Sequence, residues 1–242
     1  MIYIKQVLPV FLLSTLLVSC MNSLTGQRVK GDGNVVKETR EVAPFNSMKI
    51  EGIFNVFLHQ DGQEKVVIET DKNLLPYIVV KTVDGQLLLS WRKDISISKS
   101  TKMRIDVSLK DLKQLDIEGI GKVETVGAIN VDELNLNISG VGKTKLELNT
   151  DKLVANINAV GAVDLSGRAE NASLDIEGVG KVSAEDLVCK RLVLENSGVG
   201  KVSVHATQFL HIDSDGIGKV SYTGNPEIKE ITANGIGKVS EM

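Results

Sequence analysis

The sequence has few of the residues on which several functional classes depend. Aromatic residues are only 4% of the 242, so stacking platforms for single-stranded nucleic acids or sugars are scarce. Two cysteines cannot form a disulfide framework, and prolines number only 4. The 28 basic and 31 acidic side chains give a formal charge of −3, which argues against a dedicated nucleic-acid-binding protein. The hydrophobic content of 42% excludes a disordered chain.

Residues 1–19 predict a lipoprotein signal peptide. One charged residue, Lys5, precedes an apolar run from Val7 to Val18, which is shorter than the roughly 20 residues that a transmembrane helix needs. Residues Leu17–Cys20 resemble a bacterial lipobox. That resemblance implies cleavage before Cys20 and acylation of its thiol, which would tether the chain to a membrane. The alternative is an ordinary signal peptide followed by an incidental cysteine.

Residues 20–34 predict a flexible tether, because they are polar and show no periodicity. Met21 is not acidic, and by analogy with lipoprotein sorting this implies transfer to the outer membrane. The absence of an acidic cluster after Cys20 favours the periplasmic face, while the outer surface stays open as an alternative. The membrane, reached through the lipid anchor, is therefore the first expected partner.

A five-residue motif occurs seven times in the second half of the chain. Six copies read Gly, Ile or Val, Gly, Lys, then Val or Thr, the third reads Ala-Val-Gly-Ala-Val, and the copies recur at intervals of roughly 19 residues. The copies begin at Gly119, Gly140, Ala159, Gly178, Gly198, Gly216 and Gly235, and the third copy has Ala162 in place of lysine. Between copies, apolar and polar residues alternate, as at Leu134, Leu136 and Ile138, which is the pattern of a β-strand.

This repeat predicts an all-β fold, a parallel β-helix with one coil per repeat. One unit of this length cannot bury its own apolar face, so successive units must stack. A right-handed coil is favoured by the general preference for right-handed crossovers, and a left-handed solenoid remains open. Residues 35–242 then form a single head domain, in which residues 35–112 are irregular early coils that cap one end. Residues 113–242 are the regular coils, and a hairpin turn is expected at Asp84-Gly85.

The glycines of the motif predict a tight corner, since glycine permits a positive φ. The residue between them is always Ile or Val, and we expect it to point inward and to stack on its equivalents in neighbouring coils. Residues Gly52–Asn55 resemble one more corner, with Phe54 and Asn55 in place of glycine and lysine.

The corner lysines predict a column along one edge: Lys122, Lys143, Lys181, Lys201, Lys219 and Lys238. A mostly acidic or polar column lies four residues ahead: Glu118, Ser139, Asn158, Glu177, Ser197, Asp215 and Asn234. The favoured interpretation is that the two columns neutralise each other on a solvated edge. The alternative is a ladder that binds an extended anion, such as an acidic glycan or lipid phosphate.

The sequence singles out no catalytic residue, cofactor or metal site. The stretch Gly140–Thr144 lacks the first glycine of a phosphate-binding loop, because Asn137 stands there. Asp116 and its equivalents favour a side-chain ladder over a calcium site, which stays open as a weaker alternative. His59, His205 and His211 lack metal-ligand spacing, and Cys189 reads as a small buried residue. A polysaccharide lyase or hydrolase is the alternative to a non-enzymatic binding module, because parallel β-helices host such enzymes.

The lipobox, the segments around Gly52 and Asp84, and the coil motif together resemble a known family. The chain is similar to the auto-transporter adhesin head domain, or GIN domain, of Bacteroidetes lipoproteins, over about residues 35–242. The resemblance implies a β-helical fold at the cell envelope and an adhesin-like function, and it implies no catalytic residues.

The last copy of the motif lies close to the end of the sequence, so the final coil is expected to expose unpaired strand edges. We therefore expect an end-to-end homo-oligomer through residues 228–242.

Overall fold

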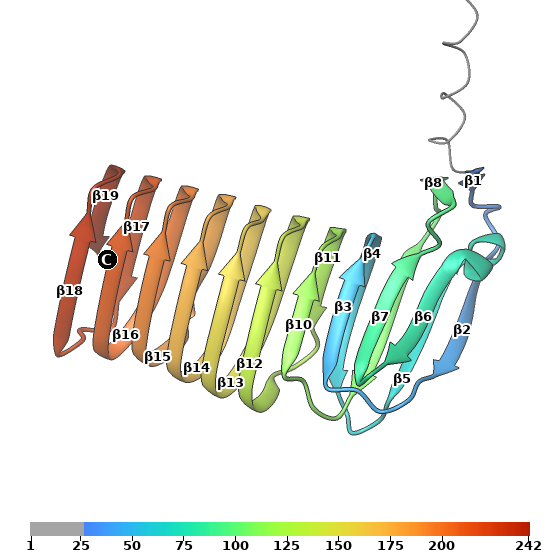
Figure 1. Cartoon of the computed structure of the whole chain (residues 1–242), viewed down its shortest axis with the longest axis horizontal. Helices are drawn as coiled ribbons and strands as arrows, with labels where there is room; N and C mark the ends of the chain where they lie inside the picture. The colour runs from blue at the N-terminus through green and yellow to red at the C-terminus, as the bar shows by residue number, and fades with distance from the viewer. Residues whose placement is uncertain (1–26) are drawn as a thin grey trace, which may run out of the picture.

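The computed structural model describes residues 27–242, which fold almost entirely into β-strands (Figure 1). They form a β-solenoid of about seven turns, with coils about 19 residues apart. The all-β solenoid predicted from the repeat is therefore confirmed. Cys20 and the expected signal peptide, residues 1–19, lie outside the described residues.

The regular part of the solenoid contains ten strands in this description: β10 (Gln114–Ile117), β11 (Ile120–Thr125), β12 (Ile129–Ile138), β13 (Val141–Ile157), β14 (Val160–Ile176), β15 (Val179–Asn196), β16 (Val199–Ser214), β17 (Ile217–Thr223), β18 (Ile228–Ala233) and β19 (Ile236–Glu241). Every pairing among them is parallel. The long strands β13 to β16 bend once and so contribute to both faces of the body.

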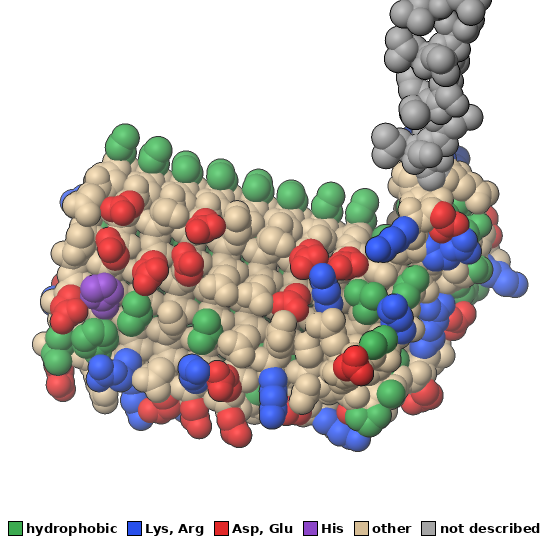
Figure 2. All heavy atoms as spheres, in the orientation of Figure 1, with side chains coloured by type: hydrophobic (Ala, Val, Ile, Leu, Met, Phe, Trp, Pro, Cys, Tyr) green, Lys and Arg blue, Asp and Glu red, His purple; other side chains and the backbone are tan. Residues whose placement is uncertain are grey.

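Two faces meet at the glycine corners. We call the outward side of the strands that follow each corner, such as β11, β17 and β19, the lysine face. The outward side of the strands that lead into each corner, such as β10, β12 and β18, is the asparagine face, and Figures 1 and 2 look onto it.

The core follows from the alternation in the sequence. Leu134, Leu136 and Ile138 are buried, and they align with Leu153, Ala155 and Ile157 of the next coil, while the intervening side chains face outward. Each coil thus stacks its apolar residues on those of its neighbours. Full burial of one leucine contributes about 1.5–3 kcal/mol to the free energy of folding, so every coil that is added increases the stability of the core.

The second glycine of the corner is required by the spacing of the coils. Gly142 has a φ of 141°, and a Cβ there would overlap the carbonyl oxygen of Gly121 in the coil below. The equivalent glycines of five other corners, Gly121, Gly161, Gly180, Gly200 and Gly218, have φ values between 131° and 146°. Only a residue without a side chain allows neighbouring coils to approach this closely while the chain turns.

The N-terminal part caps the solenoid with a mixed arrangement of strands. Its elements are β2 (Val35–Glu41), β3 (Ser47–Glu51), β4 (Ile53–Gln60), β5 (Lys65–Asp71), the 3-10 helix η1 (Lys72–Tyr77), β6 (Ile78–Val83), β7 (Gln86–Trp91) and β9 (Met103–Leu109). β3 and β4 form one more coil, because they pair in parallel with β10 and β11. The corner predicted at Gly52–Asn55 is thus confirmed, with Phe54 opposite Gly121 and Asn55 opposite Lys122.

Antiparallel pairing closes this end. β5 pairs with β2 and β9, and β6 and β7 form a hairpin whose turn residues Asp84 and Gly85 both have positive φ, as predicted. The ring of Trp91 stacks on Phe54, with their centroids 5.1 Å apart. The aromatic pair therefore covers the first corner, where the regular coils have glycine.

The folded body begins earlier than residue 35. β1 (Gln27–Lys30) pairs in parallel with β8 (Ile95–Lys99), and Gly33 N–H donates to the carboxylate of Asp71 at 2.7 Å. Residues 27–34, which the sequence assigned to the tether, are held by backbone pairing and by this buried acceptor.

Candidate functional site

The Ile or Val between the two glycines of each corner points outward, so the prediction that it points inward is wrong. Eight such residues lie in register and are exposed, and together we call them the corner ridge: Ile53, Ile120, Val141, Val160, Val179, Val199, Ile217 and Ile236. Figure 2 shows them as a straight row along one edge of the body. The expected stacking is present, but the tight reversal of the chain places the residue at the tip on the outside.

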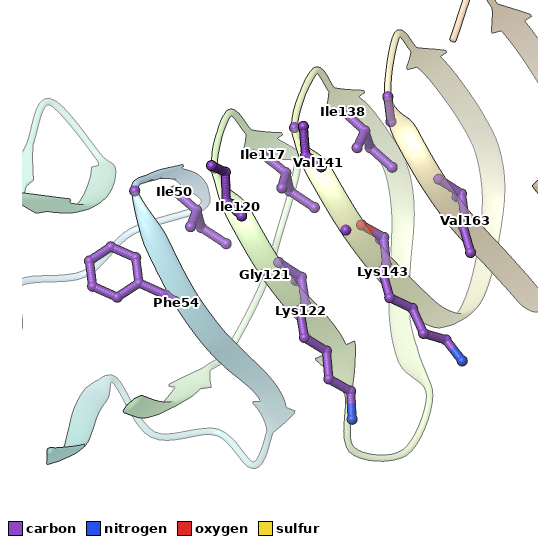
Figure 3. A pocket seen from close by; sticks show the side chains of 18 residues that line it. Ile50, Phe54, Ile117, Ile120, Gly121, Lys122, Ile138, Val141, Lys143 and Val163 are labelled. Atoms are coloured by element: carbon purple, nitrogen blue, oxygen red, sulfur yellow. The ribbon is translucent and has the colours of Figure 1, made fainter. Parts of the chain in front are cut away.

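The predicted lysine column exists on the lysine face. Lys122 aligns with Lys143, Lys181 with Lys201, and Lys219 with Lys201 and Lys238, with Ala162 as the interruption. Figure 3 shows Lys122 and Lys143 extending side by side from adjacent strands. Neighbouring strands lie about 4.7–4.9 Å apart, so the ammonium groups face solvent at close intervals.

Ala162 separates lysines that have partners from lysines that have none. Lys122 pairs with Glu124 at 2.7 Å, and Lys143 with Asp164 of the next coil at 3.4 Å. Within residues 27–242, Lys181, Lys201, Lys219 and Lys238 form no salt bridge. In the next outward row, these four lysines are followed by serine: Ser183, Ser203, Ser221 and Ser240.

We call these eight residues the lysine–serine strip. Its lysines are exposed, whereas its serines are buried or half-buried, so the hydroxyl groups lie below the ammonium groups. The Ser183 hydroxyl has no hydrogen-bond partner in the described structure. The Ser183 hydroxyl is buried, and the Ser203 hydroxyl donates to Glu185. The strip therefore offers a row of exposed cations without acidic partners, an arrangement suited to carboxylate or phosphate oxygens.

The acidic and polar column does not neutralise the corner lysines. It lies on the asparagine face, across the corner ridge, and no salt bridge among the described residues joins the two columns. Glu118 instead pairs with Lys49 at 3.1 Å, and Glu51 pairs with Lys49 at 2.8 Å. Hydrogen bonds to Glu51 and Glu118 raise the pKa of Lys49 above its ordinary value. The favoured interpretation from the sequence is thus wrong about the partners of the lysines.

A groove of about 550 Å³ continues the lysine face at the N-terminal end, lined by residues of β4, β9 and β11. The Arg104 guanidinium lies 3.7 Å from the centroid of the Phe57 ring, and it donates to Asp106 at 2.6 Å. His59 Nε2 lies 2.9 Å from the same carboxylate. Burial opposes ionisation of Asp106, but the hydrogen bonds from Arg104 and His59 outweigh it and lower the pKa of this carboxyl group.

The sequence did not reveal this groove, because β4 and β9 meet only through long-range pairing. A second groove of about 550 Å³ lies where the coils turn between two successive glycine corners, and Lys190 and Glu170 pair there at 2.6 Å. The recess behind the glycine corners, drawn in Figure 3, has a volume of about 20 Å³, room for about one water molecule.

The remaining candidates do not assemble into a reactive site. His205 Nδ1 lies 3.2 Å from the carbonyl oxygen of Glu185, and His211 Nδ1 lies 3.1 Å from Glu230. Burial raises the pKa of the Cys189 thiol to about 12, so the thiol stays protonated. The part of the chain that the structure describes contains no cluster of three His, Cys, Asp or Glu side chains able to hold a metal ion.

At the positions that suggested calcium, Asp116 and the two asparagines that follow it in register form the expected ladder. The Asn137 amide donates to Asp116 at 2.7 Å, and the Asn156 amide donates to Asn137 at 2.8 Å. These three side chains satisfy one another along the asparagine face, whereas Asp213 Oδ1, further along the same row, is buried without a hydrogen-bond partner among the described residues. Among residues 27–242, no helix has the length and apolarity needed to cross a bilayer.

Comparisons with known proteins agree with this architecture. The model of the family described as putative auto-transporter adhesin, head GIN domain, matches residues 44–226. A solved structure of a putative adhesin from Bacteroides fragilis is 27% identical, with a TM-score of 0.85 over 88% of this chain and 100% of that one. A putative lipid binding protein from Parabacteroides distasonis is 22% identical, with a TM-score of 0.70 over 89% and 100%, and it shows the fold alone. A search of curated proteins found no match.

Proposed function

Because the chain belongs to the GIN-domain family of auto-transporter adhesin heads, we propose that it is a non-enzymatic, lipid-anchored envelope protein. Its adhesin-like surface binds an extended anion along the lysine–serine strip. Family membership implies an envelope- or surface-associated protein. The lipid anchor at Cys20 and the outer-membrane location go beyond what the family implies. These two parts of the proposal rest on the sequence of residues 1–21.

The observation that carries the binding proposal is the absence of partners for Lys181, Lys201, Lys219 and Lys238 among the described residues. Four like charges held in register repel one another, and a polyanion that contacts them in turn relieves that repulsion. The lysines are exposed, so the attraction is screened by salt and is expected to weaken at high ionic strength.

The test is a binding array of acidic glycans and lipid head groups, probed with the protein and with two variants. The strip variant changes Lys181, Lys201, Lys219 and Lys238 to Gln. The control variant changes Lys49, Lys110, Lys152 and Lys190 to Gln, all of which lie outside the strip and have acidic partners. Both variants lower the formal charge from −3 to −7, four charges fewer.

Binding that the strip variant loses and the control variant keeps would support the proposal. Equal loss in both variants would mean that only the overall charge matters and would contradict a defined site. Shortening of a bound glycan would replace the proposal with a carbohydrate-active enzyme.

The anchor is tested separately by the intact mass of the protein recovered from the cell envelope. We expect a chain that begins at Cys20 and carries acyl groups, and we expect a Cys20→Ala chain to be lost from the membrane fraction. A mature chain without acyl groups would contradict the lipoprotein assignment and leave the strip to be judged by the array.

A further inference from the structure

The corner ridge is an apolar surface that the core does not explain. Its eight side chains are between 44% and 75% exposed, and bare glycine backbone lies on either side of most of them. With seven steps of about 4.8 Å, the row is about 34 Å long. Threonine would stack between coils equally well and would suit water better, yet every corner has Ile or Val. Apolar side chains on a protein surface are usually scattered singly, so a continuous row indicates a contact surface.

The expected membrane anchor lies close to one end of this ridge. Cys20 precedes Gln27, the first described residue, by seven residues, which span at most about 25 Å even when fully extended. Figure 1 shows β1 beyond the β4 end of the ridge and on the same side of the body as the corners. An acyl chain on Cys20 would therefore hold the bilayer surface within reach of the edge that exposes the ridge.

The charges beside the ridge suit an anionic bilayer. At six of the eight ridge residues a lysine lies two residues further along the chain, on the lysine face, and its long side chain can lie along a surface while the ammonium group reaches a phosphate. The acidic flank is shorter in reach and sparser, with Glu51, Glu118, Glu177 and Asp215 among serines and asparagines. A tilt toward the lysine face keeps those carboxylates in water.

We propose that the corner ridge inserts between the lipid head groups of an anionic bilayer, so that the solenoid lies along the membrane with its lysine face toward the phosphates. The proposal rests on the lipid anchor of the proposed function and names lipid phosphate as the anion that the lysine–serine strip contacts. Apolar side chains in the interface and cations at the head groups are the two contributions that hold peripheral proteins on membranes.

The first experiment measures the depth of the ridge by fluorescence. The full chain is recovered from the envelope with Val160→Cys or, as the control, Lys152→Cys, and each new thiol is labelled with an environment-sensitive dye. Cys189 is buried and does not compete for the label, and Lys152 is exposed on β13 away from the glycine corners. The labelled protein is placed on vesicles of phosphatidylcholine with one part in five of phosphatidylglycerol, with and without nitroxide-labelled lipid.

We expect the nitroxide lipid to quench the dye at position 160 at least threefold more than the dye at position 152. Equal quenching at the two positions, or none at either, would overturn the proposal. A blue shift at position 160 that needs no vesicles and grows with protein concentration would show that a second copy covers the ridge, and it would also overturn the proposal. The mass of the same preparation reports the acylation of Cys20, so failure of the anchor is recognised independently.

The second experiment removes the apolar character of the ridge without changing its shape. The ridge variant changes Val141, Val160 and Val179 to Thr, and the control variant changes Val83, Val126 and Val188 to Thr. All six valines are exposed to a similar extent, between 40% and 52%. We expect the fraction of non-acylated protein that floats with the vesicles to fall at least fivefold in the ridge variant only. An equal fall in both variants, or no change in either, would contradict the proposal.

Discussion

At the scale of single residues, the corner glycines decide how closely the coils can stack. Gly180 has a φ of 145°, and its missing side chain leaves room for the carbonyl oxygen of Gly161. Gly127 also has a positive φ, 82°, but nothing lies within 4 Å of the place where its Cβ would be. An alanine at Gly127 therefore reports only the free-energy cost of a positive φ, whereas an alanine at Gly180 reports that cost together with the steric overlap between coils.

We predict that Gly180→Ala destabilises the fold by more than about 3 kcal/mol, since strain at φ and displacement of the neighbouring coil add together. Gly127→Ala, which has only the strained φ, should cost about 1 kcal/mol. Chemical denaturation of both variants measures the difference. Equal destabilisation would show that the close approach of the coils is not what the glycine is needed for.

Asp71 is a second residue on which the N-terminal cap depends. Its buried carboxylate accepts hydrogen bonds from the backbone N–H groups of Gly33 and Thr101, both at 2.7 Å, and so joins the segments before β2 and before β9. Burial opposes ionisation, but these hydrogen bonds outweigh it and hold the pKa of Asp71 below its ordinary value.

This depressed pKa gives the wild-type protein a stability term that depends on pH. The carboxylate contributes fully above the unfolded-state value of about 3.9, and its contribution is lost as the pH falls through the lower folded-state value. We predict that Asp71→Asn costs about 2–3 kcal/mol at pH 7 and that the gap to wild type narrows as the pH falls below about 4. Denaturation across this range checks it, with Asp84→Asn as an exposed control. A gap that stays constant with pH would contradict this role.

At the scale of elements, the strands differ in how much of the solenoid covers them. β14 pairs with a neighbouring coil on both sides, through β13 and β15. β18 pairs only with β16 among the described strands, and all six of its residues are exposed. In stacked repeats, stability comes from the contacts between neighbours, so an end strand lacks half of them.

We therefore predict that backbone amides of β18 exchange with solvent at least about a hundredfold faster than those of β14. Hydrogen exchange followed by mass spectrometry resolves the two segments. Uniform protection along the body would mean that the solenoid opens only as a whole.

The elements also show what the sequence could and could not predict. The spacing of the corners and the alternation around Leu134 and Leu136 predicted the parallel coils, because the same residues recur at the same register in each. The direction of Val141 was not predictable from alternation, since a period of two says nothing about the tip of a reversal. The Lys143–Asp164 pair depends on which residues of adjacent coils align. The Phe57–Arg104 contact depends on pairing between β4 and β9 across about 50 residues of chain.

At the scale of the whole molecule, the two ends of the body differ. The cap covers the coil of β3 and β4, whereas β18 and β19 pair on one side only among the described strands. Ile228 and Ile231 are exposed there, beside free backbone donors and acceptors. Uncovered strand edges are templates for pairing with another chain.

We predict that the protein associates through residues 228–242 and that Ile228→Lys with Ile231→Lys abolishes the association, because charged side chains discourage edge pairing. Light scattering across a range of concentrations measures the mass, and Val83→Lys with Val126→Lys is the control. A wild-type monomer at every concentration would contradict the prediction.

The common register of the coils also constrains how such a protein can change in evolution. Duplication or loss of one coil, such as residues 178–197, would alter the ridge and the lysine column by one residue each and the core by one layer of apolar side chains. The lengths of the ridge, the lysine column and the core therefore change together, by one coil at a time. Selection for a longer or shorter ridge also changes the length of the lysine column. A substitution such as Ala162 is what changes one of these features alone.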